Sequence, residues 1–214
     1  MDEISDAGPR KGNVWSFTTA DFIGVDDFES YTDDSPDRIF QTWIDGFGYT
    51  DPEIVPGNNT GSTVGNVEPP FAEQNIVHGG GQSMPMDYDN TLSPFYSEAE
   101  RTWATPQDWT LNDVDTLTLY VRGRSSNDPA PLYVVVADSA GRTGVVTHPD
   151  PEVLTSIAWI EWNISLDAMT AAGVNTAAVK TLTIGVGDRA NPQADGTGTL
   201  YVDDIRVTKS AGSE

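Results

Sequence analysis

The sequence contains no cysteine, few basic residues and no long hydrophobic run. Without cysteine, the chain can form neither disulfides nor thiolate metal sites. Only 11 lysines and arginines stand against 33 aspartates and glutamates, which gives a formal net charge of −22. Nucleic acids and anionic membranes are bound by clustered cations, so this excess of acids excludes both as expected partners. No apolar run approaches the length of a membrane span, so membrane insertion is not expected.

The two ends of the chain differ from the rest. Residues 1–12 have no apolar core and do not look like a signal peptide. The stretch "GNVWSFTT" (12–19) resembles the last strand of a fibronectin type III-like module. Residues 1–20 are therefore interpreted as the end of a preceding module or a linker, and residues 210–214 as a second linker. The alternative for residues 1–20 is an ordinary first strand of the main domain.

The main domain, residues 21–209, shows β-strand patterns separated by turn-rich loops. The 20 glycines and 14 prolines of the whole chain fit many turns better than long helices. Only "LDAMTAAG" (166–173) is a helix candidate, and residues 45–70 are expected to be a long loop. Strands are predicted at 24–31, 81–89, 97–104, 115–123, 130–141, 159–166, 179–188 and 199–207.

Apolar and polar residues alternate along these strands. In one of them Leu117, Leu119 and Val121 point to one side, while Tyr120 and Arg122 point to the other. One apolar and one polar face per strand, with long loops between strands, is typical of two antiparallel sheets packed face to face. The predicted fold class is therefore an all-β, two-sheet antiparallel sandwich.

Carboxylates lie within two of the predicted strands, in "VDDFES" (25–30) and "YVDDIRV" (201–207). Alternation places Asp203 on the inward face together with Tyr201, Ile205 and Val207. A bare carboxylate is expensive there, unless a positive group lies beside it. The alternative is that these acids are solvated residues at the edge of a very acidic protein.

Three local patterns occur in a fixed order: "DDFES" (26–30), "GGGQSMPMDYDN" (79–90) and "GTLYVDDIRV" (198–207). Together they resemble the β-jelly-roll carbohydrate-binding modules of bacterial secreted glycan-degrading and cell-surface proteins. The similarity covers about residues 22–208, nearly the whole main domain. It implies a jelly roll that binds a polysaccharide or another glycan, in an extracellular or cell-surface protein with neighbouring domains.

The resemblance also implies a structural calcium ion (Ca²⁺) that ties the first strand to the last. Carried over to this sequence, its ligands are Glu29, Asp203 and oxygens near Asp27 and Gln82. Calcium takes six to eight hard oxygen ligands, which fits carboxylates mixed with carbonyls. Members of the family often have a basic residue at the position of Gln82, so this side chain departs from their pattern.

The residues that contact a sugar are not given by the resemblance, so they are sought among outward aromatic and polar side chains. Aromatic rings pack on the C–H faces of a pyranose, while carboxylates and guanidinium groups bond its hydroxyls. We expect a neutral glycan to bind on one sheet face or in loops. The candidates for a polar–aromatic patch on the concave sheet are Tyr96, Glu98, Glu100, Tyr120 and Arg122, and Trp159 is a second exposed-aromatic candidate.

Two other functions are compatible with the sequence. Glu98 and Glu100 form a carboxylate pair on one strand face, which a glycan-active enzyme could use. No other catalytic motif is present, so a module that is not an enzyme is the preferred interpretation. A calcium-stiffened spacer or adhesion unit of a large extracellular protein is the second alternative. A monomer is assumed by default, because no repeat or heptad indicates assembly.

Overall fold

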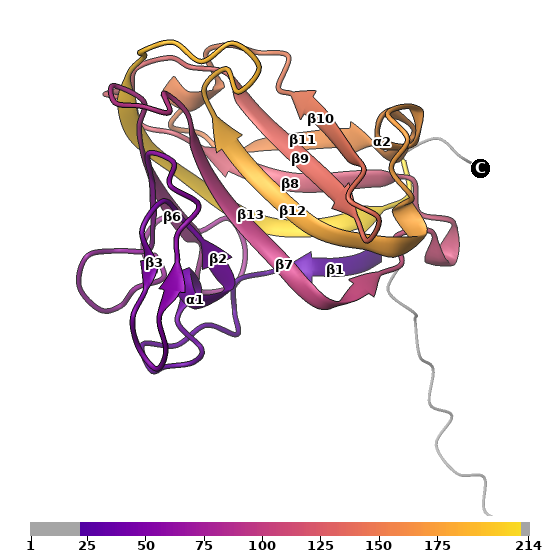
Figure 1. The fold of residues 1–214 in the computed structure, drawn as a ribbon, viewed down its shortest axis with the longest axis horizontal. Helices are drawn as coiled ribbons and strands as arrows, with labels where there is room; N and C mark the ends of the chain where they lie inside the picture. Colours follow the sequence, from indigo (N-terminus) through magenta and orange to yellow (C-terminus); the bar gives the residue numbers. More distant parts are fainter. Residues whose placement is uncertain (1–21, 211–214) are drawn as a thin grey trace, which may run out of the picture.

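The alternating segments of the sequence fold into strands that pair into two antiparallel sheets (Figure 1). The structure, a computed structural model, describes residues 22–210. The predictions for residues 1–20 and for the linker beyond Ser210 concern residues outside this range. Among residues 22–210, no helix is long and apolar enough to cross a membrane.

The first sheet, called sheet A, has the strand order β11-β8-β13-β6-β5, and β1 also pairs with β13. All of its strand pairs are antiparallel. Its strands are β1 (Phe22–Asp26), β5 (Ser62–Val64), β6 (Met84–Asp89), β8 (Thr116–Arg122), β11 (Ile160–Ser165) and β13 (Thr197–Thr208).

The second sheet, sheet B, has the order β10-β9-β12-β7-β2 and is also antiparallel. Its strands are β2 (Trp43–Ile44), β7 (Ser97–Gln107), β9 (Leu132–Asp138), β10 (Thr143–Thr147) and β12 (Val179–Val186). The predicted two-sheet jelly-roll sandwich is confirmed.

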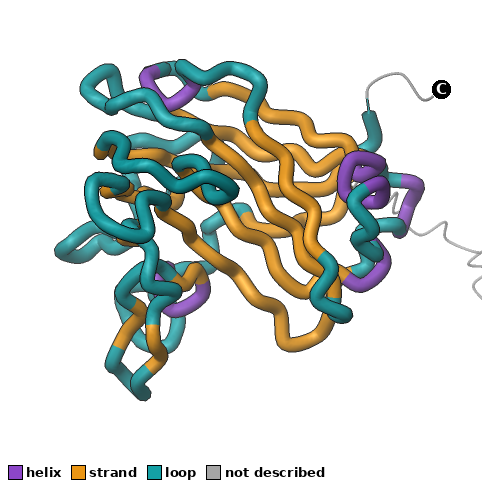
Figure 2. The backbone as a smooth tube through the Cα atoms, turned by 45° about the horizontal axis from the view of Figure 1, so that its top comes forward, coloured by secondary structure: helices purple, strands orange, loops and turns teal. Residues whose placement is uncertain are grey.

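Loops and short helical turns lie mainly at the ends of the sandwich (Figure 2). The α-helices are α1 (Ile39–Thr42) and α2 (Leu166–Ala171), and the 3₁₀ helices are η1 (Leu111–Asp113), η2 (Val153–Thr155) and η3 (Thr176–Ala178). A small ribbon of β3 (Gly48–Tyr49) and β4 (Val55–Pro56) forms a lobe beside the sandwich (Figure 1).

The predicted helix at 166–173 is confirmed as α2. Ser165 caps it, because its hydroxyl accepts a hydrogen bond from the backbone N–H of Asp167 at 3.2 Å. The prediction missed α1 and β10, and the expected loop at 45–70 contains the short strands β3, β4 and β5. Strands of two or three residues are too short to show an alternation, which explains why β3, β4 and β5 were missed.

The core lies between the sheets and contains the predicted inward residues of several strands. Leu117, Leu119 and Val121 from sheet A and Leu182 and Ile184 from sheet B are almost completely buried. The predicted alternation is wrong in β13, because the strand contains a β-bulge.

The bulge in β13 lies between Asp203 and Arg206, where the pairing with β8 shifts by one residue. Asp204 has a φ of 49° there. An extra residue in one strand reverses its alternation, so Val202 and Ile205 both face the core. Asp203 pairs with Tyr120 and shares its outward face. The predicted inward positions of Asp203 and Tyr201 are therefore wrong, although both side chains are completely buried.

Asp26 is the buried acid of the first strand. Its Oδ2 accepts hydrogen bonds from the Tyr31 hydroxyl at 2.6 Å and the Trp43 indole N–H at 2.8 Å. The same oxygen forms an ion pair with Arg101 of β7. Asp26 therefore connects β1, in sheet A, to two strands of sheet B, and these donors, with the backbone N–H of Phe28 on its Oδ1, compensate the burial of its charge.

Removing the Asp26 carboxylate should destabilise the whole sandwich. Asp26→Ala leaves the guanidinium of Arg101 and two aromatic donors without their acceptor, so we expect the free energy of unfolding to fall by about 3–5 kcal/mol. Urea unfolding followed by tryptophan fluorescence measures this change. Asp27→Ala, at the exposed neighbouring position, is the control and should change it by less than about 1 kcal/mol. Equal effects of the two substitutions would contradict this role of Asp26.

Candidate functional site

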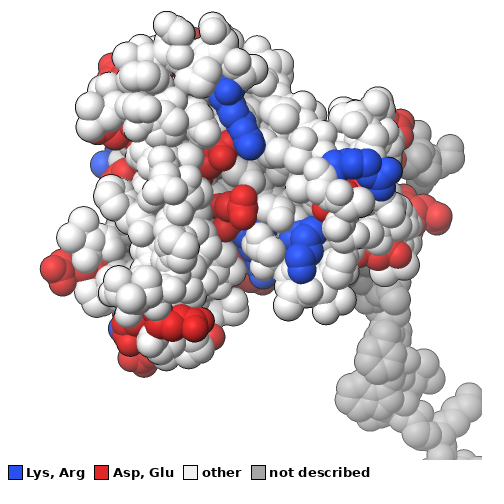
Figure 3. Space-filling view, viewed as in Figure 1, with Lys and Arg blue, Asp and Glu red and all other residues white. Residues whose placement is uncertain are grey.

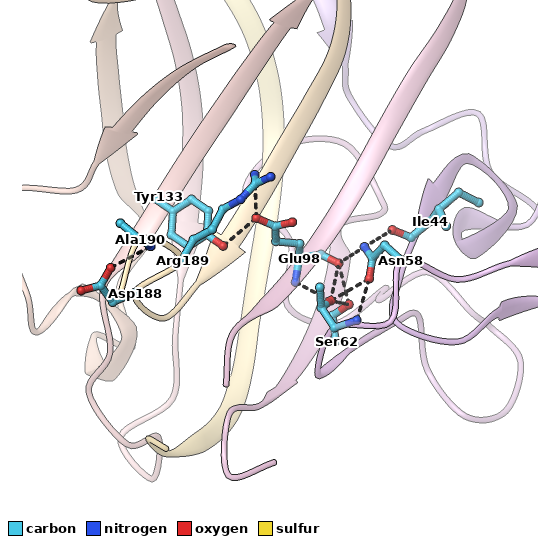
Figure 4. A network of polar contacts seen from close by, with 9 residues as sticks. Ile44, Asn58, Ser62, Glu98, Tyr133, Asp188, Arg189 and Ala190 are labelled. Carbon is cyan, nitrogen blue, oxygen red and sulfur yellow. Dashed lines mark hydrogen bonds and ion pairs between the residues drawn. The ribbon is translucent and has the colours of Figure 1, made fainter. Parts of the chain in front are cut away.

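The outer face of sheet B carries an ordered polar cluster, which we call the Glu98 network (Figure 4). Strand pairing places Glu98 of β7 opposite Gly185 of β12, and Gly185 opposite Tyr133 of β9. A side chain at position 185 would overlap the ring of Tyr133, so glycine is required for this ring to lie across β12 toward Glu98.

Glu98 is held at both its side chain and its backbone. Its Oε1 accepts hydrogen bonds from the Tyr133 hydroxyl at 2.7 Å and forms an ion pair with Arg189 at 3.1 Å. Its backbone carbonyl accepts from Asn58 Nδ2 at 2.7 Å and from the Ser62 hydroxyl at 2.6 Å. The Oε2 atom of Glu98 accepts no hydrogen bond from any residue of the described range, so one carboxylate oxygen is available to a ligand.

Arg189 lies in the loop after β12, and this loop is itself ordered. The side chain of Asp188 accepts hydrogen bonds from the backbone N–H groups of Ala190 and Asn191, both at 3.0 Å. The Arg189 side chain is 47% exposed, whereas that of Glu98 is 10% exposed. The guanidinium thus lies at the surface above a more deeply placed carboxylate, where both can reach a bound molecule.

Tyr133 is a hydrogen-bond donor at this position. Burial, and then the charge of Glu98, raise the pKa of the Tyr133 hydroxyl well above its usual range. The hydroxyl therefore stays protonated at all physiological pH values.

Beside the Tyr133 hydroxyl is a hollow lined by Tyr133, Val145, Thr147 and Arg189. Figure 3 shows this side of the molecule, where acidic and basic side chains face one another along a hollow between mostly uncharged surfaces.

The other predicted residues of sheet B lie close to the Glu98 network. Glu100 follows on the same face of β7, opposite Thr183, and its carboxylate accepts a hydrogen bond from the Thr102 hydroxyl at 3.3 Å. Tyr96 precedes β7 and packs against Gly187. The predictions missed Tyr133 and Arg189. Gly185 inside a predicted strand was a signal of a close approach, but nothing in the sequence marks Arg189.

The predicted single patch does not form. Tyr120 and Arg122 belong to β8 in sheet A, and Trp159 precedes β11 in the same sheet, whereas Glu98 and Glu100 belong to sheet B. The two groups therefore lie on opposite outer faces of the sandwich. Successive strands of a jelly roll often belong to different sheets, so closeness in sequence did not indicate closeness in space.

Residues 77–82, which we call the glycine loop, cover the outer face of sheet A over β8 and β13. The ring of His78 stacks on that of Tyr120 with centroids 3.5 Å apart. The Trp159 indole N–H donates a hydrogen bond to the Val77 carbonyl at 2.9 Å. Arg122 makes no ion pair or hydrogen bond with any residue in the described part of the chain, and its Nε atom is buried. Tyr120 and Trp159 thus hold a loop of the protein itself.

Of the four residues predicted to bind calcium, Gln82 is part of the glycine loop and Glu29 and Asp203 bind it. Asp203 Oδ2 accepts hydrogen bonds from the backbone N–H groups of His78 and Gly79, at 2.7 and 3.2 Å. Glu29 Oε1 accepts from the backbone N–H groups of Gly81 and Gln82, both at 2.9 Å. The two carboxylates therefore hold opposite ends of one loop.

This donor set does not fit the predicted metal ion. Oxygen atoms should surround calcium, but backbone N–H groups face Glu29 and Asp203, and the Gln82 side-chain amide donates to the Tyr31 carbonyl at 3.2 Å. Asp27 is exposed and accepts a hydrogen bond from the backbone N–H of Glu29 at 3.2 Å. Residues 22–210 contain no group of three or more acidic or histidine side chains that could hold a metal ion. The calcium site stays a prediction.

Comparisons with known proteins agree with the sandwich fold. The sequence matches no protein-family profile and no curated protein. The structure is similar to an exo-β-agarase, with a TM-score of 0.52 and 9% identity over 71% of this chain and 23% of that one. It is also similar to the family 30 carbohydrate-binding module of a cellulosomal cellulase of Clostridium thermocellum, with a TM-score of 0.50 and 14% identity over 80% of this chain and 93% of the module.

A family 11 carbohydrate-binding module from Clostridium thermocellum, in complex with a β-1,3-1,4-mixed-linked tetrasaccharide, has a TM-score of 0.47 and 13% identity, over 90% of this chain and 98% of the module. Identities this low show a shared fold and nothing finer. The chain spans less than a quarter of the agarase, at 23% of its length. The structural neighbours thus include carbohydrate-binding modules with a β-sandwich fold.

The buried Asp203 gives a test of both the loop contacts and the calcium prediction. Burial raises the pKa of its carboxyl from 3.8 to about 6, against the opposing effect of the backbone N–H donors. A carboxyl with a raised pKa in the folded state favours folding while it is protonated. This contribution is complete below about pH 4 and is lost as the pH rises through 6, at a cost of roughly 3 kcal/mol.

We therefore expect the free energy of unfolding, measured with a chelator present, to fall between pH 4 and 6 more steeply in the wild type than in Asp203→Asn. Urea titrations at several pH values measure this difference. Calcium bound to Asp203 would favour the charged carboxylate and remove the fall. Identical pH profiles of the wild type and Asp203→Asn would contradict the burial argument. Identical profiles of the wild type with calcium and with chelator would contradict the calcium site.

Proposed function

We propose that the protein is a carbohydrate-binding module that binds a neutral glycan on the outer face of sheet B, without catalysing a reaction. The observation that supports this most is the Glu98 network, in which Arg189, Glu98 and Tyr133 present donors and an acceptor side by side. Guanidinium and carboxylate groups bond the hydroxyls of a sugar. The apolar part of the same hollow, with Val145 54% exposed, offers contact to its C–H groups.

A neutral ligand is favoured over an anionic one by charge. The chain has a formal net charge of −22, and Glu98 and Glu100 point to the same outer face of sheet B. An anionic polysaccharide would be repelled by these groups unless cations accompanied it. The hydroxyl groups of a neutral glycan can donate hydrogen bonds to the free oxygen of Glu98.

Binding without catalysis is favoured by the positions of the two carboxylates. Glycosidases place two carboxyl groups on opposite sides of the bond that is broken. Glu98 and Glu100 are instead two residues apart on one strand and point to the same side of the sheet. In addition, Glu98 already forms hydrogen bonds and an ion pair that fix its position.

Substitution of Arg189 should weaken glycan binding. A glycan array identifies the best neutral polysaccharide, and affinity electrophoresis in gels containing it gives the dissociation constants. Arg189→Ala removes charge-assisted hydrogen bonds, so we expect affinity to fall by roughly 10–100-fold. Arg142→Ala is the matched control, since Arg142 is a similarly exposed arginine paired with Asp138 of the same sheet, and it should leave the affinity unchanged.

Tyr120→Ala tests the opposite face in the same gels. A loss of affinity in this variant but not in Arg189→Ala would move the site to sheet A, near Tyr120, Arg122 and Trp159. Absence of binding across the whole array would contradict the proposal and favour a structural spacer.

A further inference from the structure

A turn outside the Glu98 network presents an exposed aromatic ring. We call residues 45–48 the Phe47 turn; it leads from β2 into the β3–β4 lobe, and its phenylalanine is 77% exposed. A large apolar side chain that is exposed to this degree is expensive in water. What distinguishes Phe47 from other exposed apolar residues is the support behind it.

Asp45 fixes the backbone of the Phe47 turn. This residue is only 4% exposed, and its Oδ1 accepts hydrogen bonds from the backbone N–H groups of Phe47 and Gly48, both at 2.9 Å. Its Oδ2 accepts from the backbone N–H of Val64 in β5, also at 2.9 Å. Gly46 packs directly against the carbonyl of Thr60, where any side chain would collide. The ring is therefore presented by a rigid turn anchored to sheet A.

Two hollows are both lined by Phe47 and Thr63. The first is lined by Phe47, Thr60, Thr63, Asp87, Asp89 and Leu92. The second is lined by Phe47, Thr63, Phe40, Asn66, Val67 and Phe71. Phe47 thus contributes its ring to both hollows, and the exposed side chains of Leu92 in the first and Val67 in the second add further apolar surface.

The first hollow also holds polar groups that can bond a ligand. Asp87 Oδ1 accepts a hydrogen bond from the Thr199 hydroxyl at 2.6 Å, and Asp89 Oδ1 accepts from the hydroxyl of Thr91 at 2.5 Å. The second oxygen of each carboxylate accepts no hydrogen bond from residues 22–210, and neither Asp87 nor Asp89 is paired with a cation within this range. Acceptors for hydroxyl groups thus lie beside an aromatic ring.

We propose that Phe47 and the two hollows form a second sugar-binding site, which takes uncharged pyranose units. A pyranose has an apolar C–H face for the ring of Phe47 and hydroxyl donors for Asp87 and Asp89. The two carboxylates disfavour anionic sugars at this place. The site does not depend on the Glu98 network for its contacts, although Thr60 lines the first hollow and also accepts a hydrogen bond from the backbone N–H of Glu98 at 2.9 Å.

A nuclear magnetic resonance titration tests this site and the sheet B site together. ¹⁵N-labelled protein is titrated with three neutral hexasaccharides: cellohexaose, xylohexaose and agarohexaose. We expect at least one of them to shift the backbone amide signals of Phe47 and Gly48 in a saturable way. Phe47→Ala should reduce the affinity measured at Gly48 by at least tenfold, while Phe47→Trp should retain binding.

Ile54→Ala is the matched control, since Ile54 is 81% exposed in the same lobe and lines neither hollow. Its affinity should equal that of the wild type. Both positions are exposed, so the variants should keep the wild-type amide spectrum outside the lobe.

The possible outcomes separate the two proposals. Shifts confined to the residues around Glu98 would overturn the Phe47 site and leave the sheet B site intact. Shifts confined to the Phe47 turn would support the second site and contradict the first. No saturable shift at Phe47 or Gly48 with any probe, or equal affinity in Phe47→Ala, would overturn the inference. Sedimentation showing a dimer that Phe47→Ala dissociates would instead assign the ring to contact between two copies of the chain.

Discussion

The sandwich depends on one buried carboxylate, that of Asp26. Its oxygens bind the backbone N–H of Phe28, the hydroxyl of Tyr31, the indole of Trp43 and the guanidinium of Arg101. These partners belong to the turn after β1 and to two strands of sheet B. An uncompensated charge in this position would cost more than most single interactions can supply, so the partners must form together with the two sheets.

Several acids have a common role in this chain: they bind backbone N–H groups of loops. Asp45 holds the Phe47 turn, and Asp203 and Glu29 hold the glycine loop. Asp138 binds the backbone N–H of Asn175 and those of Ala140 and Arg142 in the β9–β10 turn, and the N–H of Asn175 contributes most to lowering the pKa of its carboxyl to about 2. Each carboxylate replaces the regular backbone pairing that a loop lacks. Part of the large negative charge is thus structural.

The loops held in this way determine which surfaces are open. The glycine loop covers β8 and β13 on the outer face of sheet A, where His78 stacks on Tyr120 and binds Asp203. The outer face of sheet B stays accessible at Arg189 and Val145. The two proposed sugar sites share the segment 58–63, which borders the Glu98 network on one side and the first hollow on the other. A long glycan that touched both would gain affinity from the linkage of the two contacts.

The sequence by itself determined the fold class, the positions of most long strands, helix α2 and the inward residues of β8 and β12. These features follow from the two-residue period of a strand and from local capping, and both can be read within a few residues. The sequence also indicated that the carboxylates in "VDDFES" and "YVDDIRV" lie within or beside strands, where a buried charge needs compensation.

Only the tertiary structure decided that Asp26 is the buried acid of the first strand, that a bulge turns Asp203 outward, and that Glu98 meets Tyr133 and Arg189. Each of these depends on which strands pair and in which register, and pairing is set by contacts between residues far apart in the chain. A strand's alternation gives its two faces. It does not give the sheet to which the strand belongs, so Glu98 and Tyr120 were expected on one surface and lie on opposite ones.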